Sequence, residues 1–181
     1  MGKIVIISGP SGSGKTTVCK LLEKDIQVKK STSVTTRPPR KNENNGEAYY
    51  FVSDSEFEDM ISKGELAEYA KYCGYYYGTP LNALKEALKK EGFYLLEIEV
   101  QGALQIMEKF PDAISIFLLP PDKKTLSHRL VKRNTNKEQD MAVRLKTADK
   151  ELEYKDRYDH CVVNDDLEET INTIRKILKL V

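Results

Sequence analysis

Residues 9–16 read GPSGSGKT, which matches the pattern G-x-x-x-x-G-K-[ST] of a phosphate-binding loop. Glycines let such a loop curl until its backbone N–H groups face phosphate oxygens. Lys15 adds a positive charge for the β- and γ-phosphates, and the Thr16 hydroxyl can bind Mg²⁺. The pattern therefore predicts a nucleoside triphosphate site with Mg²⁺ as cofactor. Its predicted residues are Gly9, Pro10, Ser11, Gly12, Ser13, Gly14, Lys15, Thr16 and Thr17.

A second group of charged residues lies in the stiff segment VTTRPPRKNENNGEAYY. Two prolines hold Arg37 and Arg40 on a loop with little freedom, and Glu43 follows them. An arginine guanidinium bonds a phosphate at two points through its planar fork. The segment therefore predicts a second anion site, for a ligand that carries phosphate or carboxylate.

The phosphate loop alone leaves the fate of the phosphate open. A GTPase needs an N-K-x-D motif to read guanine, and the nearest match is Asn136-Lys137-Glu138-Gln139, with Asp140 one position too late. The chain also lacks a D-x-x-G switch with its glutamine. A kinase needs a second pocket that binds an acceptor and excludes water, and the arginine segment meets that need.

Apolar runs and helical patterns alternate along the chain. Buried strands are predicted at Lys3–Ser8, Phe93–Val100, Ala113–Leu119 and Cys161–Val163. Helices are predicted at Gln101–Lys109, Asp122–Arg133 and Asp166–Leu180. This alternation favours a parallel α/β sheet. The stretches 33–80 and 123–155 break the order and are predicted as insertions in a single domain.

The amino-acid composition is that of a globular protein, and it gives no sign of binding to nucleic acid or membrane. Of the 181 residues 40% are hydrophobic and 31% charged, and the longest apolar runs are too short to cross a bilayer. The net charge of +1 points to neither nucleic acid nor membrane, so any anion site must be local. Cys19, Cys73 and Cys161 match no zinc pattern and predict reduced thiols in a cytoplasmic protein.

The chain resembles the guanylate kinase family over essentially its whole length. The resemblance is carried by GPSGSGKT, by SVTTRPPR with its trailing glutamate and NGEAYY, by YYGTP, by VQG after a strand, and by VVNDDL near the end. It implies a three-layer α/β P-loop fold with a five-stranded parallel core sheet. The implied core is 1–32, 81–122 and 156–181, with a GMP-binding insertion at 33–80 and a helical lid at 123–155. The implied reaction, part of purine nucleotide metabolism, is ATP + GMP = ADP + GDP with Mg²⁺.

The resemblance also assigns the acceptor pocket. The residues that match the family's ligands for the GMP phosphate are Arg37, Arg40, Tyr49 and Tyr77. The residues that match those reading guanine and closing the pocket are Ser33, Glu68 and Thr79. A carboxylate can accept from guanine N1–H and the N2 amino group, whereas adenine lacks both donors and would leave a buried charge unpaired. Glu43 either orients an arginine or touches GMP, and Glu99 is also predicted near GMP.

Cations surround the transferring phosphoryl group in this family and stabilise its charge. The catalytic residues that the resemblance implies are Lys15, Arg37, Arg133 and Arg144. Arg129 and Arg133, four residues apart on one helix face, would contact ATP. Asn164 falls where the family contacts adenine, whereas Asp165 and Asp166 are predicted to cap the last helix.

Two features depart from the family pattern. Glu97 and Glu99 close the predicted strand Phe93–Val100, at positions where the family often has aspartates near metal and nucleotides. The two side chains share a face because they are two apart in a strand. The resemblance implies that either glutamate could reach Mg²⁺ through water, and Glu99 is favoured over Glu97 for direct contact with the metal or a substrate. Asn134 stands where the family often has glycine after the second lid arginine.

Two other functions share parts of this pattern. A non-catalytic guanylate-kinase-like module that binds phosphopeptides typically has a degraded phosphate loop, whereas Lys15 and Thr16 are intact here. A P-loop kinase for another small phosphorylated acceptor would lack the combination of Ser33 and Glu68. The sequence leaves the oligomeric state, monomer or homo-oligomer, open.

Overall fold

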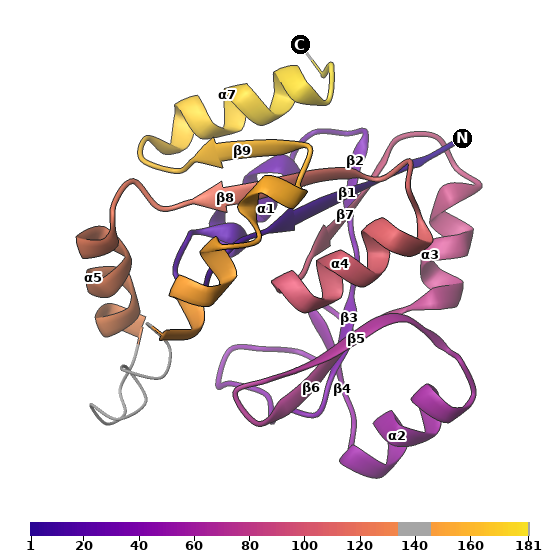
Figure 1. The fold of residues 1–181 in the computed structure, drawn as a ribbon. Helices are drawn as coiled ribbons and strands as arrows, with labels where there is room; N and C mark the ends of the chain where they lie inside the picture. Colours follow the sequence, from indigo (N-terminus) through magenta and orange to yellow (C-terminus); the bar gives the residue numbers. More distant parts are fainter. Residues whose placement is uncertain (134–145, 181) are drawn as a thin grey trace.

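A five-stranded parallel sheet forms the centre of the protein in the computed structural model, which describes residues 1–133 and 146–180 (Figure 1). All its neighbouring strands pair in parallel, which confirms the predicted fold class. In spatial order the strands are β2 (Val28–Lys30), β7 (Phe93–Glu97), β1 (Lys3–Ser8), β8 (Ile114–Leu119) and β9 (His160–Val163).

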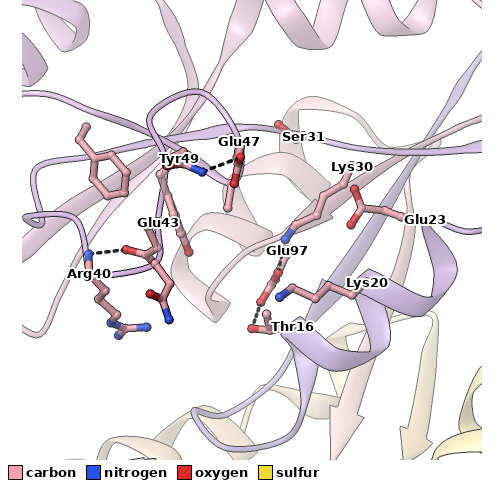
Figure 2. Close-up of a pocket in the computed structure, with 14 residues that line it drawn as sticks. Thr16, Lys20, Glu23, Lys30, Ser31, Arg40, Glu43, Glu47, Tyr49 and Glu97 are labelled. Atoms are coloured by element: carbon pink, nitrogen blue, oxygen red, sulfur yellow. Dashed lines mark hydrogen bonds and ion pairs between the residues drawn. The ribbon is translucent and has the colours of Figure 1, made fainter.

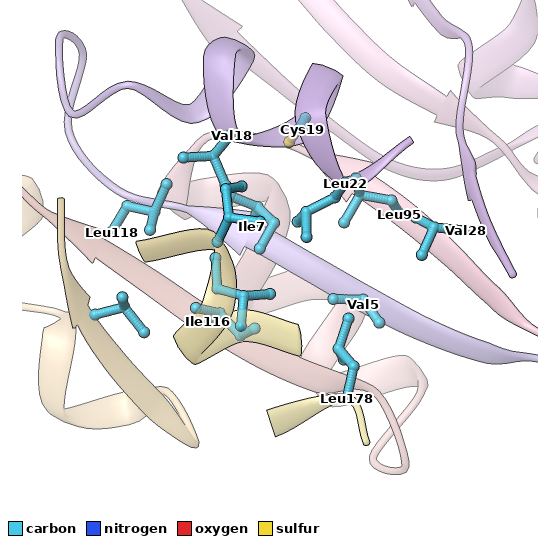
Figure 3. Packing of buried hydrophobic residues seen from close by; sticks show 13 residues of the cluster. Val5, Ile7, Val18, Cys19, Leu22, Val28, Leu95, Ile116, Leu118 and Leu178 are labelled. Carbon is cyan, nitrogen blue, oxygen red and sulfur yellow. The ribbon is translucent and has the colours of Figure 1, made fainter. Parts of the chain in front are cut away.

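Helices cover both faces of this sheet, because the apolar side chains of β1 point alternately to one face and to the other. Val5 and Ile7 point into the buried cluster shown in Figure 3, and Ile4 and Ile6 point into a second cluster on the opposite face. The helices that line the first cluster are α1 (Lys15–Leu22) and α7 (Leu167–Ile177). Those that line the second are α3 (Leu81–Leu88) and α4 (Val100–Lys109). The sheet is therefore the middle of three layers.

A second, smaller sheet lies at one end of the core and is built entirely within the segment 33–80 (Figure 1). In spatial order its strands are β4 (Tyr49–Phe51), β3 (Ser33–Thr35), β6 (Tyr75–Pro80) and β5 (Leu66–Tyr72). Beside it, α2 (Asp54–Ser62) begins with a capping box, in which Ser53 and Glu56 bond each other's backbone N–H groups. Helix α4 is tied to β5 because Gln105 Nε2 and Lys109 Nζ donate to carbonyls of that strand.

The segment predicted as a lid begins with α5 (Lys123–Arg133). Its later part is helical at 146–152 and continues into a short 3₁₀ turn, Lys155–Arg157. Arg144 lies outside the described residues, as does the side chain of Arg133. Of the helices that the structure describes, none combines the length and the apolar character needed to span a membrane.

One predicted strand is shorter in the structure, and several elements were not predicted. The strand predicted at Phe93–Val100 ends at Glu97, and Glu99 is the N-cap of α4. The N-cap is itself extended, with φ −76° and ψ 164°, so the sequence pattern of a strand runs on into it. Strand β2 was not predicted, because it has only three residues, two of them lysines. Asp166 caps α7 as predicted, by accepting from the Glu169 N–H.

Candidate functional site

The phosphate-binding loop joins β1 to α1, and its glycines adopt backbone angles that other residues avoid. Gly9, Gly12 and Gly14 have φ of 137°, 89° and 97°. A Cβ at Gly9 would overlap the Leu118 carbonyl, and one at Gly14 would overlap the Asn164 amide. Because Gly14 is the N-cap of α1 and has no side chain to cap it, the first N–H groups of the helix suit an anion.

Lys15 is buried, with 8% of its surface exposed, and is surrounded by oxygen atoms. Its Nζ donates to the Gly9 carbonyl at 2.6 Å and the Pro10 carbonyl at 3.2 Å. It also pairs with Glu99 at 3.4 Å. The Lys15 ammonium is thus held beside its own loop. A bound phosphate would replace some of these oxygen atoms as its hydrogen-bond acceptor.

The Thr16 hydroxyl is fixed by a neighbouring strand. Thr16 Oγ1 donates to Glu97 Oε1 at 2.5 Å, and Glu97 Oε2 pairs with Lys30 Nζ at 2.6 Å. Burial alone would raise the pKa of Glu97, but Lys30 and the Thr16 hydrogen bond outweigh it and lower the pKa. Glu97 is therefore held as a carboxylate. Lys30 was missed by the sequence analysis, because a lysine on a short strand gives no signal that separates it from surface charge.

These groups suit a metal that takes most of its ligands from elsewhere. Because the Thr16 hydroxyl donates its hydrogen to Glu97, its oxygen lone pairs stay available to a cation. Within 1–133 and 146–180, no cluster of three or more His, Cys, Asp or Glu side chains could hold a metal ion. The arrangement therefore fits Mg²⁺ that keeps water and phosphate ligands. Glu97 accepts the hydrogen bond from Thr16, the residue predicted to bind Mg²⁺, whereas Glu99, the glutamate favoured from the sequence, pairs with Lys15.

Arg37 is held in place by Glu43. The Arg37 guanidinium donates to Glu43 Oε1 at 2.9 Å, while Glu43 Oε2 accepts from the Arg40 backbone N–H at 2.8 Å. The guanidinium also lies 5.4 Å from the centre of the Tyr49 ring. Burial opposes the charge, but Glu43 and Tyr77 outweigh it and raise the pKa of Arg37. Of the two roles left open for Glu43, this geometry favours orienting the arginine.

A pocket of about 420 Å³ connects these two groups. Figure 2 shows Thr16, Lys30 and Glu97 along one side of it and Arg40, Glu43 and Tyr49 along the other. The second group comes from the segment 33–80, and the first comes from the core. The pocket thus brings the phosphate loop and the arginine segment, which are separate in the sequence, to a shared space. Ser33 and Tyr77 lie in the same small sheet, on β3 and β6.

Glu68 and Thr79 form a buried pair within the small sheet. They face each other across β5 and β6, and Thr79 Oγ1 donates to Glu68 Oε1 at 2.6 Å. Only 3% of Glu68 and none of Thr79 is exposed. Burial raises the pKa of Glu68 to about 7, against the opposing effects of Thr79 and Lys109. One carboxylate oxygen of Glu68 therefore accepts the hydrogen bond from Thr79. Ionising the Glu68 carboxyl in this buried position costs free energy.

Arg129 and Asn164 meet beside the phosphate loop. Arg129 donates to the Asn164 carbonyl at 3.3 Å, and both line a pocket of about 390 Å³ with Gly12, Gly14 and Thr17. The Asn164 side chain, however, faces the loop: its Nδ2 donates to the Ser13 carbonyl at 2.7 Å. Of the two predicted lid arginines, the side chain of Arg133 and the whole of Arg144 lie outside the described residues.

Glu151, on the helical segment 146–152, also reaches the phosphate loop and was missed by the sequence analysis. Burial and the nearby Glu99 together raise the pKa of Glu151 to about 7, against the opposing effects of Lys15 and the Ser11 backbone N–H. A glutamate in a densely charged helical stretch resembles a solvated surface residue. The sequence therefore offered no signal for this contact.

The raised pKa of Glu68 makes stability depend on pH. Unfolded, the carboxyl titrates near 4.5, whereas in the folded chain it titrates near 7. Between these values the folded state binds the extra proton, so the free energy of unfolding falls as pH rises, by up to ~3 kcal/mol. Glu68→Gln keeps the acceptor for Thr79 but removes the titration. Urea unfolding between about pH 5 and about pH 8 should therefore show wild type losing stability relative to Glu68→Gln.

The exposed glutamate Glu58 of α2 provides the matched control. Glu58→Gln should follow the wild-type pH profile. A constant difference between wild type and Glu68→Gln across this range would contradict the assignment of a buried, proton-binding carboxyl.

Comparison with known proteins identifies the family. The family model for guanylate kinase matches residues 1–180. A guanylate kinase of Desulfitobacterium hafniense (strain Y51) is 46% identical over 178 residues, covering 98% of this chain and 89% of its own. One from Clostridium tetani (strain Massachusetts / E88) is 45% identical over 177 residues, covering 98% and 85%.

Solved structures agree with the sequence relatives. The crystal structure of guanylate kinase from Anaplasma phagocytophilum superimposes with a TM-score of 0.81 at 38% identity, covering 99% of this chain and 85% of that one. The match extends over both sheets, because nearly the whole chain is covered. This chain therefore belongs to the guanylate kinase family.

Proposed function

We propose that this protein transfers the γ-phosphoryl group of ATP to GMP, giving ADP and GDP, and that it does so with Mg²⁺ in the cytoplasm. Membership of the guanylate kinase family supports the reaction as a whole. The phosphate loop would hold ATP, and the segment 33–80 would hold GMP. Because the GMP phosphate is itself the nucleophile, the reaction needs positioned charges and no general base.

The observation that carries the choice of acceptor is the buried Glu68–Thr79 pair. Thr79 occupies Glu68 Oε1 at 2.6 Å, which leaves the second oxygen, Oε2, as an acceptor for donors of a bound base. Guanine offers two neighbouring donors, N1–H and the N2 amino group. A base without those donors would leave the charge buried and unpaired, which disfavours adenine, uracil and cytosine.

The charges needed for transfer come from both halves of the site. Lys15 and the first N–H groups of α1 would hold the triphosphate, and Arg37 would hold the acceptor phosphate. Thr16 and Glu97 would hold Mg²⁺, directly or through water, and the ion would neutralise charge on the phosphates. The roles of Arg133 and Arg144 in closing a lid at 123–155 stay predictions from the family resemblance.

The acceptor is tested by ADP release from ATP and Mg²⁺ with GMP, AMP, UMP, CMP or no acceptor. We expect fast release with GMP alone. Glu68→Gln should raise the KM for GMP by roughly tenfold to a hundredfold, because it removes a charged hydrogen-bond acceptor. The KM for ATP should stay unchanged.

Other outcomes point to the rival functions. Release with a different monophosphate would make the protein a kinase for another acceptor. No release with any acceptor, together with tight GMP binding, would favour a binding module without catalysis.

Asn164 is expected to act through the phosphate loop rather than by reading adenine. Its Nδ2 bonds the Ser13 carbonyl at 2.7 Å, its Oδ1 accepts from Thr170 at 3.2 Å, and only 5% of the residue is exposed. These contacts brace the turn at Gly14, where the loop enters α1. An adenine ring would have to displace them to reach the amide.

Binding of inorganic tripolyphosphate separates the two roles, because it has phosphates but no base. If Asn164 braces the loop, Asn164→Ala should weaken ATP and tripolyphosphate by the same factor, roughly fivefold to a hundredfold for one buried hydrogen bond. Weaker binding of ATP with unchanged binding of tripolyphosphate would show that the side chain reads adenine instead. Asn82→Ala, at an exposed position of α3, should change neither affinity.

A further inference from the structure

Gly102 lies in the first turn of α4, two residues after the start of the helix, and is buried. Its φ is not positive, so any residue could adopt its backbone conformation. Glycine nevertheless costs a helix about 1 kcal/mol relative to alanine. Helix propensity therefore gives no reason for glycine at this position, and the reason must lie in its surroundings.

The surroundings of Gly102 are the carboxylate of Glu68. A Cβ added at Gly102 would overlap Glu68 Oε2 and would lie 2.9 Å from Cδ, which real Cβ atoms essentially never do. Outside α4 itself, the atoms of the described chain nearest to the added Cβ all belong to the Glu68 side chain. The missing side chain of Gly102 is thus the space that the buried carboxylate fills.

Neither partner of this contact can move away easily. Glu68 is buried, and its other oxygen is held by Thr79 at 2.6 Å. Helix α4 is fixed against β5 by Gln105 Nε2, which donates to the Tyr69 carbonyl at 2.7 Å, and by Lys109 Nζ, which donates to the Ala67 carbonyl at 2.6 Å. A methyl group at position 102 would therefore displace the carboxylate of Glu68.

We propose that Gly102 is a positioning residue for acceptor specificity. By lacking a side chain, it lets the Glu68 carboxylate lie against α4 with Oε1 on Thr79 and Oε2 turned away from that hydroxyl. This rests on the proposed function, in which Glu68 reads guanine. Gly102 itself would touch neither nucleotide, and its effect would pass entirely through the orientation of Glu68.

The test is a double-mutant cycle of wild type, Gly102→Ala, Glu68→Ala and the double variant. In the wild-type background, Gly102→Ala should raise the KM for GMP roughly tenfold to a hundredfold and leave the KM for ATP unchanged. In the Glu68→Ala background, where the carboxylate is absent, the same change should not alter the KM for GMP further. There it should also raise the urea midpoint, because alanine favours helix.

Results other than those expected would overturn either the proposed function or this inference. Wild type that fails to phosphorylate GMP would overturn the proposed function, whereas active wild type with an unchanged KM for GMP in Gly102→Ala would overturn this inference alone. Equal rises in the KM for ATP and GMP would also overturn it, since they would show general damage. If Gly102→Ala does not fold, the double variant must be at least as stable as Glu68→Ala, or the contact is not the cause. Glu108→Ala, exposed on the same helix, should match wild type.

Discussion

The hydrogen bond from Thr16 to Glu97 fixes the phosphate loop to strand β7. The positions of the phosphate loop and of the acceptor pocket in the segment 33–80 both depend on this strand. Glu97 ends β7, Glu99 meets Lys15, and the chain then enters α4 directly. The same helix packs its first turn against Glu68 and its last turn against β5. One short segment, 97–109, thus sets the position of the Glu68 carboxylate, which is proposed to read guanine, relative to the phosphate loop. A shift at either end would change the distance that the phosphoryl group must cross.

Charges in the site are paired in advance. Lys15 pairs with Glu99, Lys30 with Glu97 and Arg37 with Glu43, all with little exposure of the cations. This matches a chain whose net charge is only +1, because the anion sites are local rather than part of a basic surface. Pairing avoids the free-energy cost of an isolated buried charge. When a phosphate binds, each cation then only exchanges its carboxylate partner for a phosphate oxygen. Glu68 differs from these pairs, since a hydroxyl rather than a cation bonds its carboxylate.

Local patterns were predictable, and contacts between distant segments were not. The phosphate loop, the parallel sheet and the cap at Ser53 follow from residues close in sequence. The strand predicted at Phe93–Val100 was too long because an extended N-cap continues the strand pattern. Lys30 and Glu151 were missed because they acquire partners only when separate elements meet. The close approach of Gly102 to Glu68 was missed as well, because the two residues are far apart in the sequence.

In the function proposed for this protein, the phosphate loop and the acceptor pocket act together as one site on two nucleotides. The most direct test of this joint action is calorimetric binding of adenosine and guanosine joined through five phosphates, with Mg²⁺ present. Because the linked ligand engages the second half-site intramolecularly, it should bind at least ~100-fold more tightly than ATP or GMP alone. Binding no tighter than that of the better single nucleotide would contradict the account, since the two half-sites could not then be filled together.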